Sequence, residues 1–330
     1  MTWIAYLGRR LGRALAVILG VLIISFCLVR LAPGDPASLM AGEAGVDDAQ
    51  YIQNLRHSMG LDQPLAQQLW TYLRHAAQLD LGYSYRNQAT VWSLIAERLP
   101  ATLLLMGSGF LLSALIGVAM GVLAALSHRR RGIADRFISH AALVLYATPS
   151  FWLALLLVLV FSVLLDWLPA FGMASVGVEL HGWRWVLDYA SHLLLPALSL
   201  SFMFLALYVQ LTRSAVLESL NQEYVRTARA KGLKPGRILY DHVLRNALLP
   251  VVTYAGLQLG QLASGSLLIE VVYAWPGIGR LLYDALTQRD YPLLLGVFLV
   301  ISVLVVVFNM LTDLLCRVID PRIGAGGQRS

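Results

Sequence analysis

Six long stretches of this 330-residue chain, of 16 residues or more, contain no Asp, Glu, Lys or Arg, and no other feature constrains the fold as strongly. An α-helix needs about 20 apolar residues to cross the roughly 30 Å hydrocarbon layer of a bilayer, and all the stretches but the first reach that length. At the ends of the first stretch, Arg13 and Arg30 can extend their charged groups to the membrane surfaces. The chain is therefore predicted to be all-α and polytopic, with six transmembrane helices at 14–29, 99–128, 137–165, 189–212, 246–269 and 291–312.

Composition and charge support a membrane location. Only 13% of the residues are charged, against about 25% in soluble domains. With both termini in the cytoplasm, 17 of the 25 Lys and Arg residues lie inside and 8 outside, as the positive-inside rule requires. The net charge of +6 follows from this bias, so the lipid bilayer is an expected partner and nucleic acid is not. Arg30 follows the first apolar stretch without a small-residue cleavage motif, so that stretch is expected to be an uncleaved helix.

The segment from Glu223 to Pro250 is basic and rich in helix-forming residues, and its charges exclude it from the bilayer. Gly232 is placed to end a first helix in the left-handed conformation, and Pro235 to begin a second. Two short helices between spans, on the basic side of the membrane, are suited to docking a soluble partner.

The sequence of this segment resembles that of a known family. ARAKGL (Ala228–Leu233) and HVLRNALLP (His242–Pro250) resemble the cytoplasmic EAA coupling loop of binding-protein-dependent ABC-transporter permeases, in the peptide/opine/nickel branch. Eight further motifs of that branch occur in the expected order along nearly the whole chain: RLAPGDP (Arg30–Pro36), GLDQPL (Gly60–Leu65), DLGYSYR (Asp80–Arg86), ERLPATLLL (Glu97–Leu105), TPSFW (Thr148–Trp152), YAWPGIGRLLYDAL (Tyr273–Leu286), RDYPL (Arg289–Leu293) and DPRI (Asp320–Ile323).

The resemblance implies a permease subunit in the bacterial inner membrane. Its implied partners are a homologous permease, two cytoplasmic ABC ATPase subunits that bind ATP and Mg, and a periplasmic substrate-binding protein. The implied substrates are dipeptides or oligopeptides, nickel chelates, opines or glutathione. This chain itself is expected to bind no cofactor.

The resemblance also assigns candidate residues. Where the general loop pattern has Glu-Ala-Ala, this chain has Arg226, Thr227 and Ala228, so Glu223 is the candidate acidic docking residue. The full ATPase-coupling set is Glu223, Arg226, Thr227, Ala228, Arg229, Ala230, Lys231 and Gly232. The implied periplasmic gate is Pro276, Gly277, Ile278 and Gly279, a sequence that cannot continue a helix.

Polar groups inside the fifth stretch are the candidates for a translocation path. Gln258, Gln261 and Ser264 need polar partners or water in a hydrocarbon layer, so they are expected to face the protein interior. Both a substrate passage and a helix–helix hydrogen bond fit this pattern. The pairs Gly117–Gly121 and Gly256–Gly260 form GxxxG, which favours close helix packing.

The predicted organisation has four parts. Residues 1–31 form a cytoplasmic segment and the first span, and 32–98 a small periplasmic region. Residues 99–314 form the transmembrane core with a coupling loop at 215–247, and 315–330 a cytoplasmic tail. The periplasmic region fits a gate or partner platform, and equally a structural lid.

Missing motifs argue against other functions. Lys231 and Lys234 are the only lysines, and neither lies in a phosphate-binding GxxxxGK[ST] loop. The seven histidines are scattered, and no catalytic or metal-ligand arrangement is expected. A self-sufficient secondary carrier or channel is the alternative, but it predicts intramembrane charges or inverted halves with broken helices. A membrane-bound enzyme would need a catalytic constellation.

Overall fold

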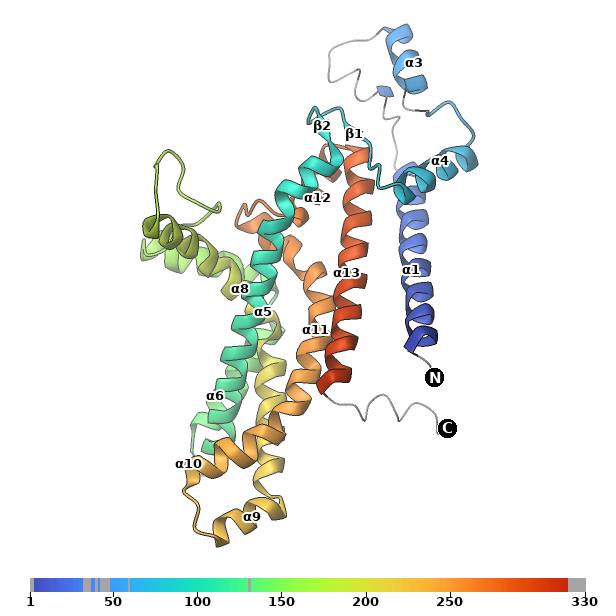
Figure 1. The fold of residues 1–330 in the computed structure, drawn as a ribbon. Coiled ribbons are helices and arrows are strands. Elements are labelled where there is room, and N and C mark those ends of the chain that lie inside the picture. Colours follow the sequence, from blue (N-terminus) through green and yellow to red (C-terminus); the bar gives the residue numbers. More distant parts are fainter. Residues whose placement is uncertain are drawn as a thin grey trace. The chain divides into compact units, whose positions relative to one another are not determined.

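The computed structural model describes residues 3–31, 37, 38, 41, 48–58, 60–129 and 132–319, and it is predominantly helical (Figure 1). Side chains are not described at 3–7, 9, 257, 259–265 and 313–319. The chain divides into two compact units. Unit 1 comprises Met1–Pro100 and Leu281–Val306, and unit 2 comprises Ala101–Arg280 and Val307–Ser330.

Four helices of the described chain are long and apolar enough to cross a membrane. They are Arg10–Leu31 within α1 (Trp3–Leu31), all of α5 (Val91–Arg129) and α8 (Trp183–Leu220), and Tyr291–Thr312 within α13 (Tyr291–Ile319). Each contains one of the predicted spans. The absence of charge over about 20 residues was therefore sufficient to locate them.

The predicted span at 137–165 is broken in its middle. It forms α6 (Ala134–Ala147) and α7 (Ser150–Leu157), which continues into the π-helix η1 (Val158–Leu164), and the two halves are bent by 108°. Thr148 takes an extended conformation (φ −84°, ψ 131°) because the ring of Pro149 disfavours helical geometry at the residue before it. Counting this bent pair as one span gives five candidates among the described residues.

The remaining predicted span, 246–269, falls within α11 (Arg245–Val272). Several of its side chains lie outside the described residues, so the total of six spans stays a prediction. Two short segments precede this helix without a break, α10 (Pro235–Arg237) and the π-helix η2 (Ile238–Leu244). A turn then leads from α11 into α12 (Ile278–Thr287).

In unit 2, α8 packs against α6, α7 and α11. Its contact with α5 depends on two glycines. A Cβ at Gly117 would lie 2.4 Å from Cβ of Tyr208, and one at Gly121 would lie 2.6 Å from Cβ of Thr212. The structural role predicted for this GxxxG pair is therefore confirmed. Gly260 of the second pair has no described side-chain environment.

Unit 1 adds a small sheet that the all-α prediction did not include. Strands β1 (Tyr83–Ser84) and β2 (Ala89–Thr90) pair antiparallel, with Tyr83 opposite Thr90. The hydroxyl of Ser84 donates a hydrogen bond to the carboxylate of Asp290, which brings two distant sequence motifs together. The same unit contains α3 (Ala49–Ser58), α4 (Leu65–Ala77) and a cavity of ≈ 520 Å³ lined by α1, α4 and the start of α13.

Candidate functional site

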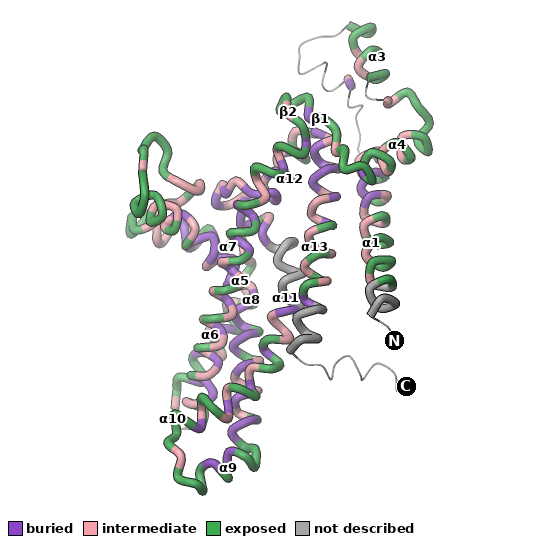
Figure 2. Tube along the Cα trace, in the orientation of Figure 1, coloured by how far each residue is buried: buried purple, intermediate pink, exposed green. Residues whose placement is uncertain are grey.

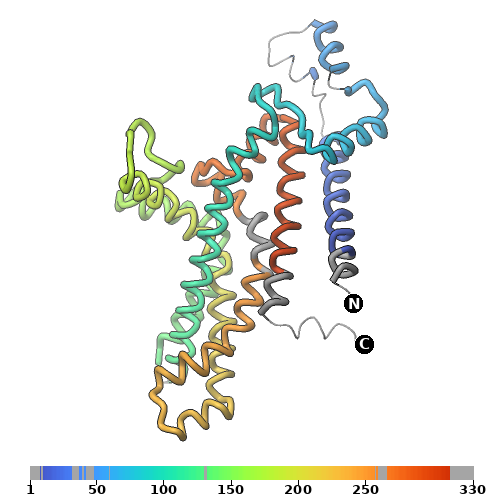
Figure 3. Tube along the Cα trace, viewed as in Figure 1, coloured from blue at the N-terminus to red at the C-terminus, as the bar shows by residue number. Residues whose placement is uncertain are grey.

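The first candidate site is the 215–247 loop, where the chain leaves α8, forms α9 (Glu223–Ala230) and returns through α10 into η2 (Figure 3). Extended Gln222 (φ −72°, ψ 151°) separates α8 from α9. An apolar cluster of unit 2 lies beneath the loop and joins its helices to the ends of α5, α8 and α11. Its buried members are Ala125, Val216, Leu220, Val225, Ala228, Ile238, Val243 and Ala247.

Helix α9 buries one narrow stripe and exposes the rest of its surface (Figure 2). Val225 is 0% and Ala228 4% exposed, and a spacing of three residues places both on one helix face. The predicted docking position Ala228 therefore packs the helix onto its own unit and presents no surface to a partner. The exposed predicted residues are Glu223, Arg226, Thr227, Arg229, Ala230, Lys231 and Gly232.

Gly232 ends this helix with φ +75°, in the left-handed conformation expected from the sequence. Its N–H donates to the carbonyl of Arg229 at 2.9 Å, and the N–H of Leu233 donates to that of Ala228 at 3.3 Å. These are the two bonds of a Schellman motif. Leu233 then packs on the apolar cluster, so the end of α9 is fixed by both hydrogen bonds and burial.

The exposed face of α9 carries charge of both signs. Arg226 donates to Glu223 at 2.7 Å, and both side chains are more than half exposed. Such an exposed pair adds little stability, so these charges remain available to a partner. Sequence reasoning missed two aromatic residues of the same loop, Tyr224 and Tyr240, which are 38% and 74% exposed. Exposed tyrosines are frequent anchors in protein interfaces.

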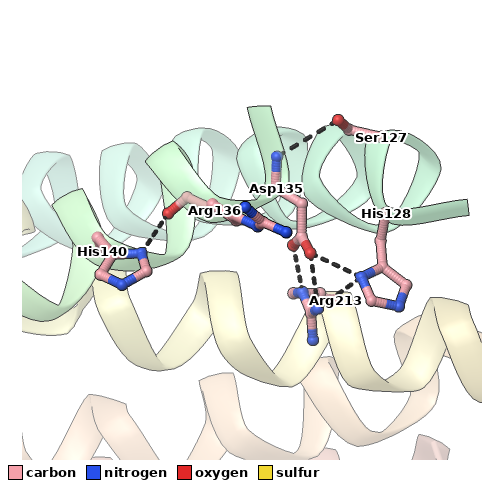
Figure 4. A network of polar contacts seen from close by, with 6 residues as sticks. All are labelled: Ser127, His128, Asp135, Arg136, His140 and Arg213. Atoms are coloured by element: carbon pink, nitrogen blue, oxygen red, sulfur yellow. Dashed lines mark hydrogen bonds and ion pairs between the residues drawn. The ribbon is translucent and has the colours of Figure 1, made fainter. Parts of the chain in front are cut away.

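An ion-pair network joins three helices of unit 2 (Figure 4). Asp135 on α6 accepts from Arg213 on α8 at 2.5 and 2.9 Å, and its second oxygen lies 2.7 Å from Nδ1 of His128 on α5. The side chain of Asp135 is 9% and that of Arg213 26% exposed. Two parallel bonds between guanidinium and carboxylate fix orientation as well as distance.

Asp135 lies two residues before the uncharged 137–165 stretch, outside the predicted span. The hydrogen bonds from Arg213 lower the pKa of this carboxyl to about 2, aided by His128 and opposed by partial burial. The carboxyl group of Asp135 is therefore ionised at neutral pH. The ends of α5, α6 and α8 are held together by a charged bridge near the 215–247 loop.

The second candidate site is the turn at 273–279, which contains the predicted gate residues. Trp275 is fully buried and its indole N–H donates to the carbonyl of Ala101 on α5 at 2.9 Å. The hydroxyl of Tyr273 lies 2.8 Å from that of Ser199 on α8 and donates to Ala154 on α7 at 3.1 Å. The turn is thus fastened to three helices of its own unit.

The two glycines of the turn face a buried carboxylate that sequence reasoning missed. Glu270, at the end of α11, is 0% exposed. A Cβ at Gly277 would lie 2.3 Å from its Cδ, and one at Gly279 would lie 2.7 Å from Cα of Leu267. Only glycine fits at these positions while the backbone approaches Glu270 this closely. A lone Glu directly after an uncharged stretch gave no local signal of burial.

Of the predicted path residues, Gln258 alone has a described side chain. Gln258 is 1% exposed, and neither side-chain atom of its amide has a hydrogen-bond partner among the described residues. Gln261 and Ser264 lie outside the described side chains. Among the described residues, no three His, Cys, Asp or Glu side chains gather in a metal-binding arrangement.

Comparison with known proteins identifies the family. The model of the family called binding-protein-dependent transport system inner membrane component matches residues 117–325. The model of the corresponding N-terminal part matches residues 3–106. The chain belongs to this family. The resemblance inferred from the motifs is therefore confirmed, and the protein is a multi-pass inner-membrane permease subunit of an ABC importer.

Relatives match this permease over almost its full length. The di/tripeptide transport system permease protein DppB of Pseudomonas aeruginosa is 40% identical, covering 97% of this chain and 98% of its own. The dipeptide transport system permease protein DppB of Escherichia coli K12 is 38% identical, covering 96% and 98%. The oligopeptide transport system permease protein AppB of Bacillus subtilis is 39% identical, covering 97% and 99%.

A solved structure supports the fold of the permease. An inward-facing form of the MetNI methionine ABC transporter contains a chain that matches with a TM-score of 0.54 at 19% identity. The match covers 69% of this permease and 96% of that chain. The shared part is the membrane fold of an ABC permease.

Proposed function

We propose that this permease forms the translocation path of an ATP-driven importer for dipeptides or oligopeptides, as the B-type subunit of a pair of permeases. The names of its full-length relatives in three bacteria support a peptide substrate. The range of substrates implied by the family also includes nickel chelates, opines and glutathione. A homologous permease completes the path, and a periplasmic binding protein delivers the solute.

The observation that carries the ATP-driven mechanism is the exposed face of α9. Helix α9 lies at one end of unit 2 (Figure 1), and the seven candidate residues in and directly after α9 are exposed, as are Tyr224 and Tyr240. Two ATPase subunits, which hold ATP and Mg, dock there and on the equivalent loop of the second permease. Closure of the ATPases pushes α9, and the Schellman end passes this movement to the cluster beneath it.

The proposal also includes the membrane arrangement, the path and the gate. The permease has six spans, with both termini and the 215–247 loop in the cytoplasm and 32–98 in the periplasm. Residues 99–314 form the core, and 315–330 a cytoplasmic tail. Gln258, Gln261 and Ser264 line the path, because polar residues within an otherwise apolar membrane-spanning stretch mark substrate pathways. Pro276, Gly277, Ile278 and Gly279 form the periplasmic gate.

The test is reconstitution in proteoliposomes with the second permease, the ATPase subunits and the binding protein. We expect uptake of a labelled dipeptide only when ATP and the binding protein are both present. Uptake by the permeases alone would favour a secondary carrier and contradict this proposal.

A charge-matched pair of variants tests the docking surface. Arg229→Glu reverses an exposed charge on α9, whereas Arg184→Glu reverses an exposed charge at the first turn of α8, before the uncharged 189–212 stretch and far along the helix from the 215–247 loop. Arg229→Glu is expected to reduce ATPase copurification about tenfold, equivalent to about 1.4 kcal/mol, while Arg184→Glu leaves it unchanged. Equal copurification of the two variants would remove α9 from the interface.

A further inference from the structure

The fully buried carboxylate of Glu270 has an unusual set of partners. Glutamate is almost never completely buried unless its charge is compensated. Here the carboxylate accepts hydrogen bonds from the hydroxyl of Thr102 at 2.9 Å and from the backbone N–H of Arg280 at 3.0 Å. Both of these donors are uncharged, so Glu270 serves as a hub of hydrogen bonds.

Thr102 extends this hub by one more bond. Its oxygen accepts the backbone N–H of Ile278 at 2.7 Å, and its single hydroxyl proton goes to Glu270. Helix α12 begins at Ile278, and the first N–H groups of a helix have no partner within it. Glu270 and Thr102 therefore cap the first turn of α12 from two other helices, and a negative charge is favourable at that end of a helix.

The hub also determines the shape of the turn. The N–H of Trp275 donates to the backbone carbonyl of Glu270 at 2.8 Å, so main chain and side chain of one residue hold both ends of the turn. The guanidinium of Arg280 donates to the carbonyl of Ala274 at 2.6 Å. A Cβ at Gly277 or Gly279 would collide with Glu270, so the turn can lie this close to the carboxylate only with glycine at both positions.

We propose that Glu270 is the positioning residue of the 273–279 turn, with Thr102 as its relay to the first turn of α12. This inference rests on the proposed function, in which the turn is the periplasmic gate. Glu270 is fully buried, so it acts through the turn and does not touch the solute. When these hydrogen bonds are lost, closure of the gate is no longer coupled to closure of the ATPases, and ATP is hydrolysed without transport.

Isosteric substitutions separate the hub from simple packing. Thr102→Val keeps the volume of the side chain but removes both the donor to Glu270 and the acceptor for Ile278. Thr102→Ser keeps the hydroxyl. Glu270→Gln keeps the shape but presents an NH₂ group to N–H donors. The control is Ser108→Ala on α5, whose hydroxyl donates to the carbonyl of Leu105 in its own helix.

The experiment uses the complete transporter in nanodiscs with two readouts. Hydrogen exchange of the peptide covering 273–280 reports the N–H groups of Ile278 and Arg280 directly. The ratio of ATP hydrolysis with and without binding protein reports coupling. Thr102→Val and Glu270→Gln are expected to accelerate exchange at least tenfold and to lower the ratio at least threefold. Thr102→Ser and Ser108→Ala stay within twofold of wild type in both.

Two results would overturn the proposal. One is exchange in Thr102→Val that matches Thr102→Ser, because the hub would then not hold the turn. The other is faster exchange with unchanged coupling, because the shape of the turn would then be irrelevant to gating. A wild-type transporter without binding-protein-dependent hydrolysis would instead contradict the proposed function, and the exchange result would still report on the hub.

Discussion

At the scale of single residues, Gly232 and Gly236 lie four positions apart in the same loop, and a Cβ added at either meets no atom within 4 Å. They differ in backbone conformation, because only Gly232 has a positive φ, +75°. A side chain at Gly232 is therefore strained by about 1–2 kcal/mol through its own backbone and not through a collision.

This difference gives a matched pair of substitutions. Gly232→Ala is expected to loosen the end of α9 and to reduce both dipeptide uptake and ATPase copurification several-fold. Gly236→Ala should leave both quantities close to wild type. Gly232→Asn should retain most of the wild-type uptake and copurification, because Asn tolerates left-handed geometry. The measurement is uptake and ATPase content side by side. Indistinguishable values for the two alanine variants would mean that the left-handed position has no role in coupling.

At the scale of helices, the bridge of Asp135, Arg213 and His128 predicts a large difference between two ion pairs. Asp135→Asn leaves Arg213, which is mostly buried, without its charged partner, and charged hydrogen bonds contribute about 1.5–3 kcal/mol. Asp241→Asn removes an exposed pair with Arg237, and such pairs contribute only about 0.3–0.5 kcal/mol.

Thermal unfolding of the detergent-purified permease checks this prediction. Asp135→Asn should lower Tm by several degrees, and Asp241→Asn by less than one. The pKa of Asp135 is lowered, so its contribution is complete above the pKa of an unfolded Asp, about 3.9, and is lost as pH falls towards 2. The difference between the variants should therefore persist from pH 5 to pH 8. A difference that vanished within that range would argue against an ionised bridge.

Helices were also where sequence reasoning succeeded and failed most clearly. Exclusion of charge over a bilayer's thickness located α5 and α8, because that constraint acts on composition alone. The same argument could not detect the bend between α6 and α7, since composition carries no direction, although Pro149 was a local signal of it. Gly232 was predictable because a helix end is a local event. Glu270 was not, because Thr102 lies 168 positions away.

At the scale of the whole molecule, the distribution of basic residues predicts on which side of the membrane each loop lies. The 17-to-8 division of basic residues predicts Lys234 inside and Gln67 outside. Both positions are exposed, so a cysteine at either can react with a thiol reagent.

Labelling of intact cells checks the orientation. In a background without Cys27 and Cys316, Gln67→Cys should react with a membrane-impermeant maleimide, and Lys234→Cys only after the cells are opened. The reverse pattern would place α9 in the periplasm, away from any ATPase.

An uninterrupted run of helix from Pro235 through η2 to Val272 connects the coupling loop to the 273–279 turn. At 1.5 Å per residue the run is about 55 Å long, and it begins beside α9 and ends two residues after Glu270. Each residue of a helix turns the chain by about 100°. One residue inserted near Pro250 would thus rotate Glu270 away from Thr102 while leaving the composition of the span unchanged. The length of this helix between the two sites is therefore constrained to the residue, because an insertion changes the direction of every side chain that follows it.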